Sequence, residues 1–186
     1  MIIDNLLLFT GTSNGASGVP VLGANTDRPT TGTQVSSNII DLHMAGIPVL
    51  ANLQGARDMG IGDDPALKIM AVVVTTFGAG TNMILTLQGA PDNGSGAPGT
   101  FVSWWSSPTY TTAQLVQGAR LFDMDMPRPP AAVQVPRFLQ FQYVSTGTFT
   151  SGALEIAIVL DRMDQMYNST NNAIMGGYPP GIVVAN

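Results

Sequence analysis

Cysteine is absent from this chain of 186 residues, and other residues that often perform chemistry are scarce. The absence of cysteine excludes disulfide bonds and thiolate metal sites. Histidine occurs once, as His43, lysine once, as Lys68, and glutamate once, as Glu155. Because a catalytic triad needs a positioned base beside a nucleophile, one histidine leaves few combinations. The scarcity of lysine and glutamate, with 21 glycines and 13 prolines, also argues against an α-helical protein.

Charge is also in short supply. Charged residues make up 10% of the chain, against about 25% in an average soluble protein. Uncharged polar residues must therefore cover most of the surface, which suits a protein that stays docked on a partner. The net charge is −5, and the seven basic residues are scattered. Since duplex DNA binding requires clustered lysine and arginine, direct nucleic-acid binding is not expected.

Long hydrophobic runs are missing as well. No apolar stretch approaches the roughly 20 residues that a membrane-spanning helix requires. Residues 1–9 lack a basic segment and carry Asp4 within the apolar stretch, so no signal peptide is expected. These features predict a soluble protein that is made in a cytosol and has no membrane partner.

Short apolar segments between turn residues predict a mostly β protein. Residues 67–77 form the longest strand signal, and both faces are apolar, as in a central strand. Residues 82–88 alternate, with Met83, Leu85 and Leu87 on one face. Further strands are predicted at residues 38–42, 100–105 and 120–126, with one helical turn around residues 112–116. Without βαβ spacing, this pattern indicates one antiparallel β-sandwich.

Two more strands are predicted near the end of the domain. Residues 137–145 place Leu139, Phe141 and Tyr143 on one face, with glutamines opposite. Residues 153–161 alternate in the same way. We expect these strands to pair as an antiparallel hairpin across residues 147–152, with both apolar sets on one inward face.

The sandwich is predicted to span residues 38–162, between two arms. Residues 1–37 are rich in Gly, Ser, Asn and Pro after a short apolar start, and this composition does not form a core by itself. Residues 163–186 are polar and end in an apolar tip. Each arm is interpreted either as disordered chain or as a segment that becomes ordered on a partner.

Candidate chemistry is sparse. Carboxylate pairs occur at Asp63 with Asp64, Asp123 with Asp125, and Asp161 with Asp164. Paired carboxylates can hydrolyse glycosides, but one partner usually needs a pKa raised by an apolar pocket. Residues 58–64 offer oxygens to calcium without the spacing of an EF-hand, and residues 11–15 lack the lysine of a P-loop. We expect no catalytic residue, no metal and no cofactor.

The candidate interface residues are apolar and aromatic. Trp104 and Trp105 are adjacent on a predicted strand, so one should be buried and the other exposed, where tryptophan is enriched at interfaces. In the tail, Tyr178, Ile182 and Val183 follow a polar tether and would form the docking tip.

Several segments resemble a known family. The most specific segments are residues 137–143, 146–153 and 158–161. Weaker matches, in the family order, are residues 39–42, 56–60, 66–74, 78–81 and 83–88. Over residues 38–162 the chain resembles the capsid cement, or decoration, proteins of the Bordetella-phage type. Residues 10–37, the stretch between Leu42 and Arg57, and the tail depart from the shorter family members.

The resemblance implies a jelly-roll-like domain on the outer surface of a virion. Its partner would be the major capsid protein of an HK97-type shell, and the protein would often be a homodimer that clamps neighbouring capsomers. Two alternatives remain. A carbohydrate-binding β-sandwich module would use Trp104 and Trp105 to bind sugars, whereas another coat or tail component would assemble by itself.

Overall fold

The computed structural model describes residues 3–11, 26–42, 67–130, 136–159, 166–168 and 173–175. Almost every regular element is a strand, and a single 3-10 turn, η1 (Thr112–Gln114), coincides with the expected helical turn. The strands are β1 (Ile3–Leu8), β2 (Gly32–Val35), β3 (Ile40–Asp41), β4 (Lys68–Gly78), β5 (Asn82–Ala90), β6 (Val102–Ser106), β7 (Tyr110–Thr111), β8 (Arg120–Asp125), β9 (Phe138–Thr146), β10 (Ser151–Val159), β11 (Met166–Asn168) and β12 (Ala173–Met175).

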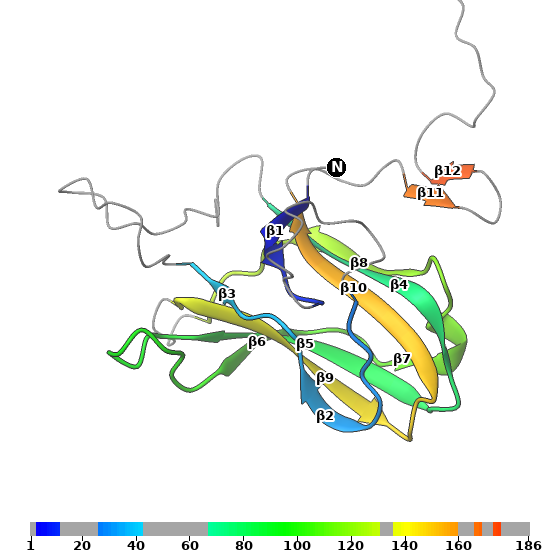
Figure 1. Ribbon diagram of the computed structural model, residues 1–186, viewed down its shortest axis with the longest axis horizontal. Coiled ribbons are helices and arrows are strands. Elements are labelled where there is room, and N and C mark those ends of the chain that lie inside the picture. Colours follow the sequence, from blue (N-terminus) through cyan, green and yellow to red (C-terminus); the bar gives the residue numbers. More distant parts are fainter. Residues whose placement is uncertain are drawn as a thin grey trace, which may run out of the picture.

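Two antiparallel sheets face each other in a sandwich (Figure 1). The four-stranded sheet has the order β1-β10-β4-β8, and the six-stranded sheet has the order β2-β9-β5-β6, with β3 beside β9 and β7 beside β5. The pairs β1–β10, β2–β9, β4–β8 and β5–β6 correspond to one long antiparallel hairpin rolled up on itself. This arrangement is a jelly roll, so the expected fold is confirmed.

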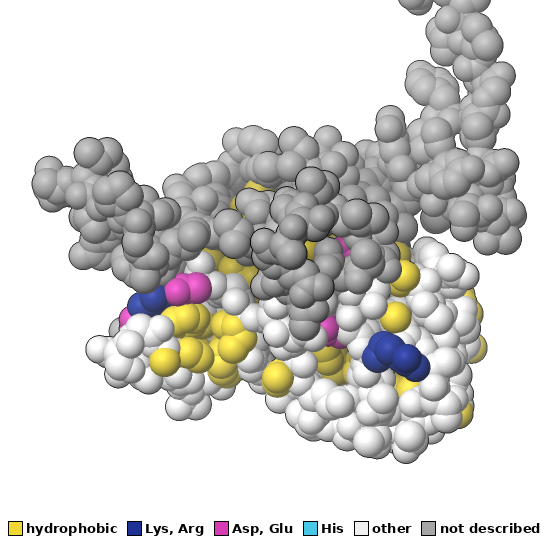
Figure 2. Space-filling view, viewed as in Figure 1, with side chains coloured by type: hydrophobic (Ala, Val, Ile, Leu, Met, Phe, Trp, Pro, Cys, Tyr) yellow, Lys and Arg dark blue, Asp and Glu magenta, His cyan; other side chains and the backbone are white. Residues whose placement is uncertain are grey.

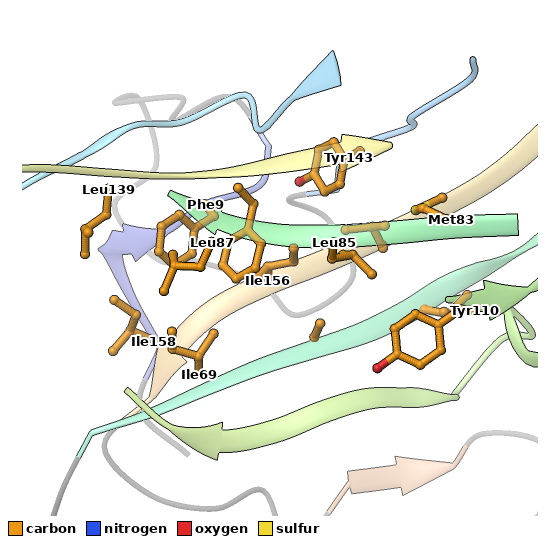
Figure 3. Close-up of a cluster of buried hydrophobic side chains, with 14 of the residues drawn as sticks. Phe9, Ile69, Met83, Leu85, Leu87, Tyr110, Leu139, Tyr143, Ile156 and Ile158 are labelled. Carbon is orange, nitrogen blue, oxygen red and sulfur yellow. The ribbon is translucent and has the colours of Figure 1, made fainter. Parts of the chain in front are cut away.

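The core lies between the two sheets, where alternate residues of each strand point inward. Met83, Leu85 and Leu87 of β5 are fully buried, as their alternation predicts. Figure 3 shows them meeting Ile156 and the other labelled residues in this layer. A second buried cluster lies on the opposite face of the four-stranded sheet and consists of Leu8, Met70, Val72, Ala157 and Val159. Strand β4 is therefore apolar on both faces because both faces are buried.

The closing pair of strands corrects one expectation. Strands β9 and β10 do not form a hairpin with each other, because β9 belongs to the six-stranded sheet and β10 to the four-stranded sheet. Their apolar sets still point inward, and Phe141 and Ile156 are both fully buried. The alternation of apolar residues shows which face of a strand is buried. It does not show whether two strands are hydrogen-bonded neighbours in one sheet or face each other across the core, because the alternation is the same in both cases.

The first 37 residues also differ from the expected arm. Strand β1 pairs with β10 and β2 pairs with β9, so both belong to the sandwich. Phe9 is fully buried and meets Phe141 edge-on, with 4.9 Å between ring centroids. The low hydrophobicity of residues 10–37 concealed their place in the sandwich, because this segment is held by backbone pairing and a few buried side chains. A fragment starting at residue 38 would lack two strands. In the tail, β11 and β12 pair with each other.

Candidate interaction surfaces

A buried carboxylate closes one side of the sandwich. The backbone of Asp27 exchanges two hydrogen bonds with Leu154 of the four-stranded sheet, at 2.9 and 3.0 Å. Its side chain accepts hydrogen bonds from the backbone N–H groups of Gly11 and Ser37, both at 3.0 Å, and from the Ser37 hydroxyl. The Tyr143 hydroxyl of the six-stranded sheet donates a further bond, 2.7 Å long. Asp27 therefore joins both sheets to the N-terminal segments.

The environment of Tyr143 follows from this arrangement. Burial disfavours the charged phenolate, and the neighbouring Asp27 carboxylate repels it and holds the hydroxyl proton in a hydrogen bond. These causes raise the pKa of Tyr143 well above its usual value. The sequence did not reveal this group of residues, because Asp27 looks like an ordinary loop residue before Arg28 and Pro29.

The two tryptophans lie on the opposite side of the sandwich and correct a second expectation. The ladder between β5 and β6 is irregular here: Leu87 pairs with Trp105, whereas Gln88 pairs with Ser103. Trp104 is therefore an extra residue in β6 with no partner in β5, which makes a β-bulge. Because of the bulge, Trp104 and Trp105 are both half-buried and both pack against the core, instead of pointing to opposite faces.

Each tryptophan has a specific neighbour. The Trp105 ring meets Phe122 of β8 edge-on, with 4.9 Å between centroids, and so bridges the edge strands of the two sheets. The Trp104 ring covers Gly89 so closely that a Cβ atom placed there would lie 2.4 Å from the indole. Both side chains thus fill the open side of the sandwich and leave only part of their surface for a partner.

One arginine organises a corner of the six-stranded sheet. Arg137 forms a two-pronged ion pair with Asp41 of β3, with both N–O distances 2.9 Å, and a further ion pair with Asp92. Its guanidinium carbon lies 4.8 Å from the centroid of the Phe138 ring. The hydrogen bonds to Asp41 and then to Asp92 raise the pKa of Arg137 further, so this cation stays charged.

The loop at residues 91–99 projects from this corner. The Asp92 carboxylate accepts bonds from the N–H groups of Gly94 and Gly96, at 2.8 and 3.0 Å, and these contacts, with Arg137, lower its pKa. Both glycines have positive φ, which is why residues without a side chain stand there. The loop is exposed yet internally bonded, which reduces the entropy it would lose on binding.

The outer face of the six-stranded sheet is uncharged along its middle. Thr86 pairs with Gln142, and Gln88 pairs with Gln140, whose side-chain amide donates a 2.8 Å hydrogen bond to the side-chain oxygen of Gln88. Thr86, Gln88 and Gln140 are all buried, so this polar strip is not exposed. Among the described strands of this sheet, only β3 contains a charged residue, Asp41, and it pairs with Arg137 just before β9. Figure 2 shows the same scarcity on the side turned to the viewer, where basic and acidic side chains form a few isolated spots among polar and apolar ones.

The structure describes only some of the remaining residues that the sequence suggested as sites. Tyr178, Ile182 and Val183 lie outside the described residues, as do His43, Asp161, Asp164 and all of residues 58–64, including Asp63 and Asp64. In β8, Asp123 forms a partly buried ion pair with Arg120, with an N–O distance of 3.0 Å, and the exposed Asp125 forms an ion pair with Lys68, so both carboxylates are held in ion pairs.

Among the residues with described coordinates, no three His, Cys, Asp or Glu side chains cluster in a way that could hold a metal ion. The described segments also contain no helix with the length and apolar character needed to cross a membrane.

A known protein family matches most of the sandwich. The model of the Bbp16 family matches residues 26–158, which include β2 to β9, nearly all of β10, and Asp27, Arg137 and the two tryptophans, but neither β1 nor Gly11. No curated protein matches the chain. Because the family match covers well over half of the chain, this protein belongs to the Bbp16 family, a family of phage proteins.

Proposed function

We propose that this protein is a capsid cement protein that binds the outer surface of an HK97-type shell and stabilises contacts between capsomers. The observation that carries the proposal is the Bbp16 match across a jelly roll. The partner would be the major capsid protein, and the protein would reside on the outside of the virion. The resemblance also implies a homodimer, and we propose that state.

The surface supports a structural role. Charged side chains are few on the face drawn in Figure 2, and an internally bonded loop projects from one corner of the six-stranded sheet. A cement protein repeats one modest interface over many symmetric copies, so each contact needs only the usual area of about 1,600 Å². Binding only to the assembled shell then stabilises the shell by mass action.

We also propose that the protein is not an enzyme. Three of its described carboxylates serve structural contacts: Asp27 receives four hydrogen-bond donors, and Asp41 and Asp92 hold Arg137. The sugar-binding alternative relied on an exposed tryptophan, and the half-buried packing of Trp104 and Trp105 against the core removes that support.

Co-sedimentation with empty, expanded shells of the coat protein tests the cement role. We expect saturable binding and a higher temperature of shell disruption, with heat-unfolded protein as the negative control. Assembly of the protein alone into large particles would instead favour a coat or tail component. Binding to a glycan array without binding to shells would favour the carbohydrate module.

A further inference from the structure

Strand β2 is an edge strand without the protection that the longer edge strands β1, β6 and β8 carry. Edge strands usually avoid pairing with foreign strands through charges, prolines or bulges. Strand β8 carries Arg120, Asp123 and Asp125, and its ladder with β4 is irregular. Strand β6 contains the bulge at the tryptophans. The ladder of strand β1 with β10 is also irregular.

Strand β2 has none of these features. It reads Gly-Thr-Gln-Val, it pairs with β9 in unbroken register, and all four residues are exposed. Val35 is 52% exposed, the highest value among the large apolar side chains described. The charge-free stretch extends beyond the strand, because no residue from Pro29 to Ile40 is charged.

The register shows which backbone groups point to the open edge. The Ser36 N–H donates to the Phe141 carbonyl, so the backbone groups of Ser36 point toward β9. In an antiparallel ladder the bonded positions alternate, so Gly32 and Gln34 also face β9. The N–H and C=O groups of Thr33 and Val35 therefore point away from the sheet. Among the described residues, neither amide donates a further backbone hydrogen bond.

We propose that β2 pairs with β2 of a second copy of this chain across a two-fold axis at Gln34. Thr33 then faces Val35 of the other copy, and the two outward pairs exchange four backbone hydrogen bonds. Both six-stranded sheets become one continuous sheet.

The lack of charge around β2 favours a second copy of this chain as the partner. Near a two-fold axis each residue lies close to its own counterpart, so any charged residue there would meet a like charge. The uncharged run from Pro29 to Ile40 meets this condition. A four-residue contact is small against the roughly 1,200–2,000 Å² of a stable interface, so the dimer should be weak and concentration-dependent.

The absence of cysteine from the chain permits a clean crosslinking test. Gln34 would form a non-hydrogen-bonded pair with its counterpart, with Cα atoms about 4.5 Å apart, inside the range of a disulfide. Gln34→Cys should therefore give a covalent dimer under air oxidation, several-fold more than Ser103→Cys on the exposed edge β6. Non-reducing electrophoresis measures the yield, and circular dichroism verifies the fold of each variant.

A second variant makes the test specific for backbone pairing. Val35→Pro removes an N–H that points to the open edge and leaves the bonds to β9 intact, and proline is tolerated at such positions. Adding Val35→Pro to Gln34→Cys should abolish the crosslink while the fold remains. A crosslink that persists, or equal yields from Gln34→Cys and Ser103→Cys, would overturn the proposal.

Pairing through β2 rests on the homodimer in the proposed function, and different results would reject the β2 contact and the cement role. Analytical ultracentrifugation that shows a dimer of the unmodified chain, with no crosslink at Gln34→Cys, would place the dimer contact elsewhere and overturn β2 pairing alone. Shell binding by a strict monomer would retain the cement role and reject the dimer together with its contact.

Discussion

The hydroxyl of Tyr143 lies 2.7 Å from a carboxylate oxygen of Asp27, although 116 residues separate them in the chain. Tyr143 belongs to the six-stranded sheet, and the backbone of Asp27 is bonded to Leu154 of the four-stranded sheet. This contact therefore links the two layers on the side where the N-terminal segments enter the core.

Removal of the Asp27 carboxylate should be costly. In Asp27→Ala the four donors that now bond to the carboxylate lose their partner, and each unsatisfied buried donor costs about 1–3 kcal/mol. We expect a loss of about 3 kcal/mol or more in the free energy of unfolding, measured by denaturant titration. Asp125→Ala is the control, because an exposed ion pair contributes at most about 1 kcal/mol. Equal losses would contradict the structural role of Asp27.

The raised pKa of Tyr143 predicts a loss of stability in alkali. The unfolded chain releases this proton near its ordinary pKa of about 10, whereas the folded protein keeps it to higher pH. The contribution to stability is therefore complete below about pH 10 and is lost as pH rises towards the folded pKa. Unfolding titrations across this range should show a steeper decline for the native chain than for Tyr143→Phe. Identical slopes would argue against a buried, hydrogen-bonded hydroxyl.

Strand β9 should tolerate change on one face and not on the other. Phe141→Ala removes a fully buried ring and should cost about 3–5 kcal/mol. Gln142→Ala changes the neighbouring residue on the outer face and should cost within about 0.5 kcal/mol. Comparable losses in denaturant titrations of the two variants would be incompatible with this strand.

The contact between Gly89 and Trp104 predicts an interaction between two substitutions. Gly89→Ala places a methyl group against the indole and should cost about 1–3 kcal/mol, as overpacking usually does. In a Trp104→Ala background the same change should cost less than about 1 kcal/mol, because the obstructing ring is gone. A double-mutant cycle of unfolding free energies measures the difference, and simple additivity would refute the contact.

Arg137 should control the order of the loop at residues 91–99. Lysine keeps the charge but cannot form the two-pronged contact with Asp41 while also binding Asp92. Arg137→Lys should therefore increase amide hydrogen exchange in the loop, measured by mass spectrometry. Arg128→Lys, at an exposed arginine, serves as the matched control and should leave the exchange unchanged.

The sequence by itself determined the class of fold and the inward face of most strands. The alternation of Met83, Leu85 and Leu87 predicts a strand with one buried face, because side chains on a strand alternate between its two faces. The same argument predicted the burial of Phe141 and Ile156, and both are fully buried. These are local properties, and a period of two can be read from neighbouring residues alone.

Only the tertiary structure decided which strands are partners and which polar residues are buried. The sheet assignment of β9 and β10 depends on how the whole chain rolls up, and alternation is the same for either partner. The bulge at Trp104 depends on the ladder with β5. The role of Asp27 depends on donors from Gly11, Ser37 and Tyr143, which meet only in the folded protein because they are distant in sequence.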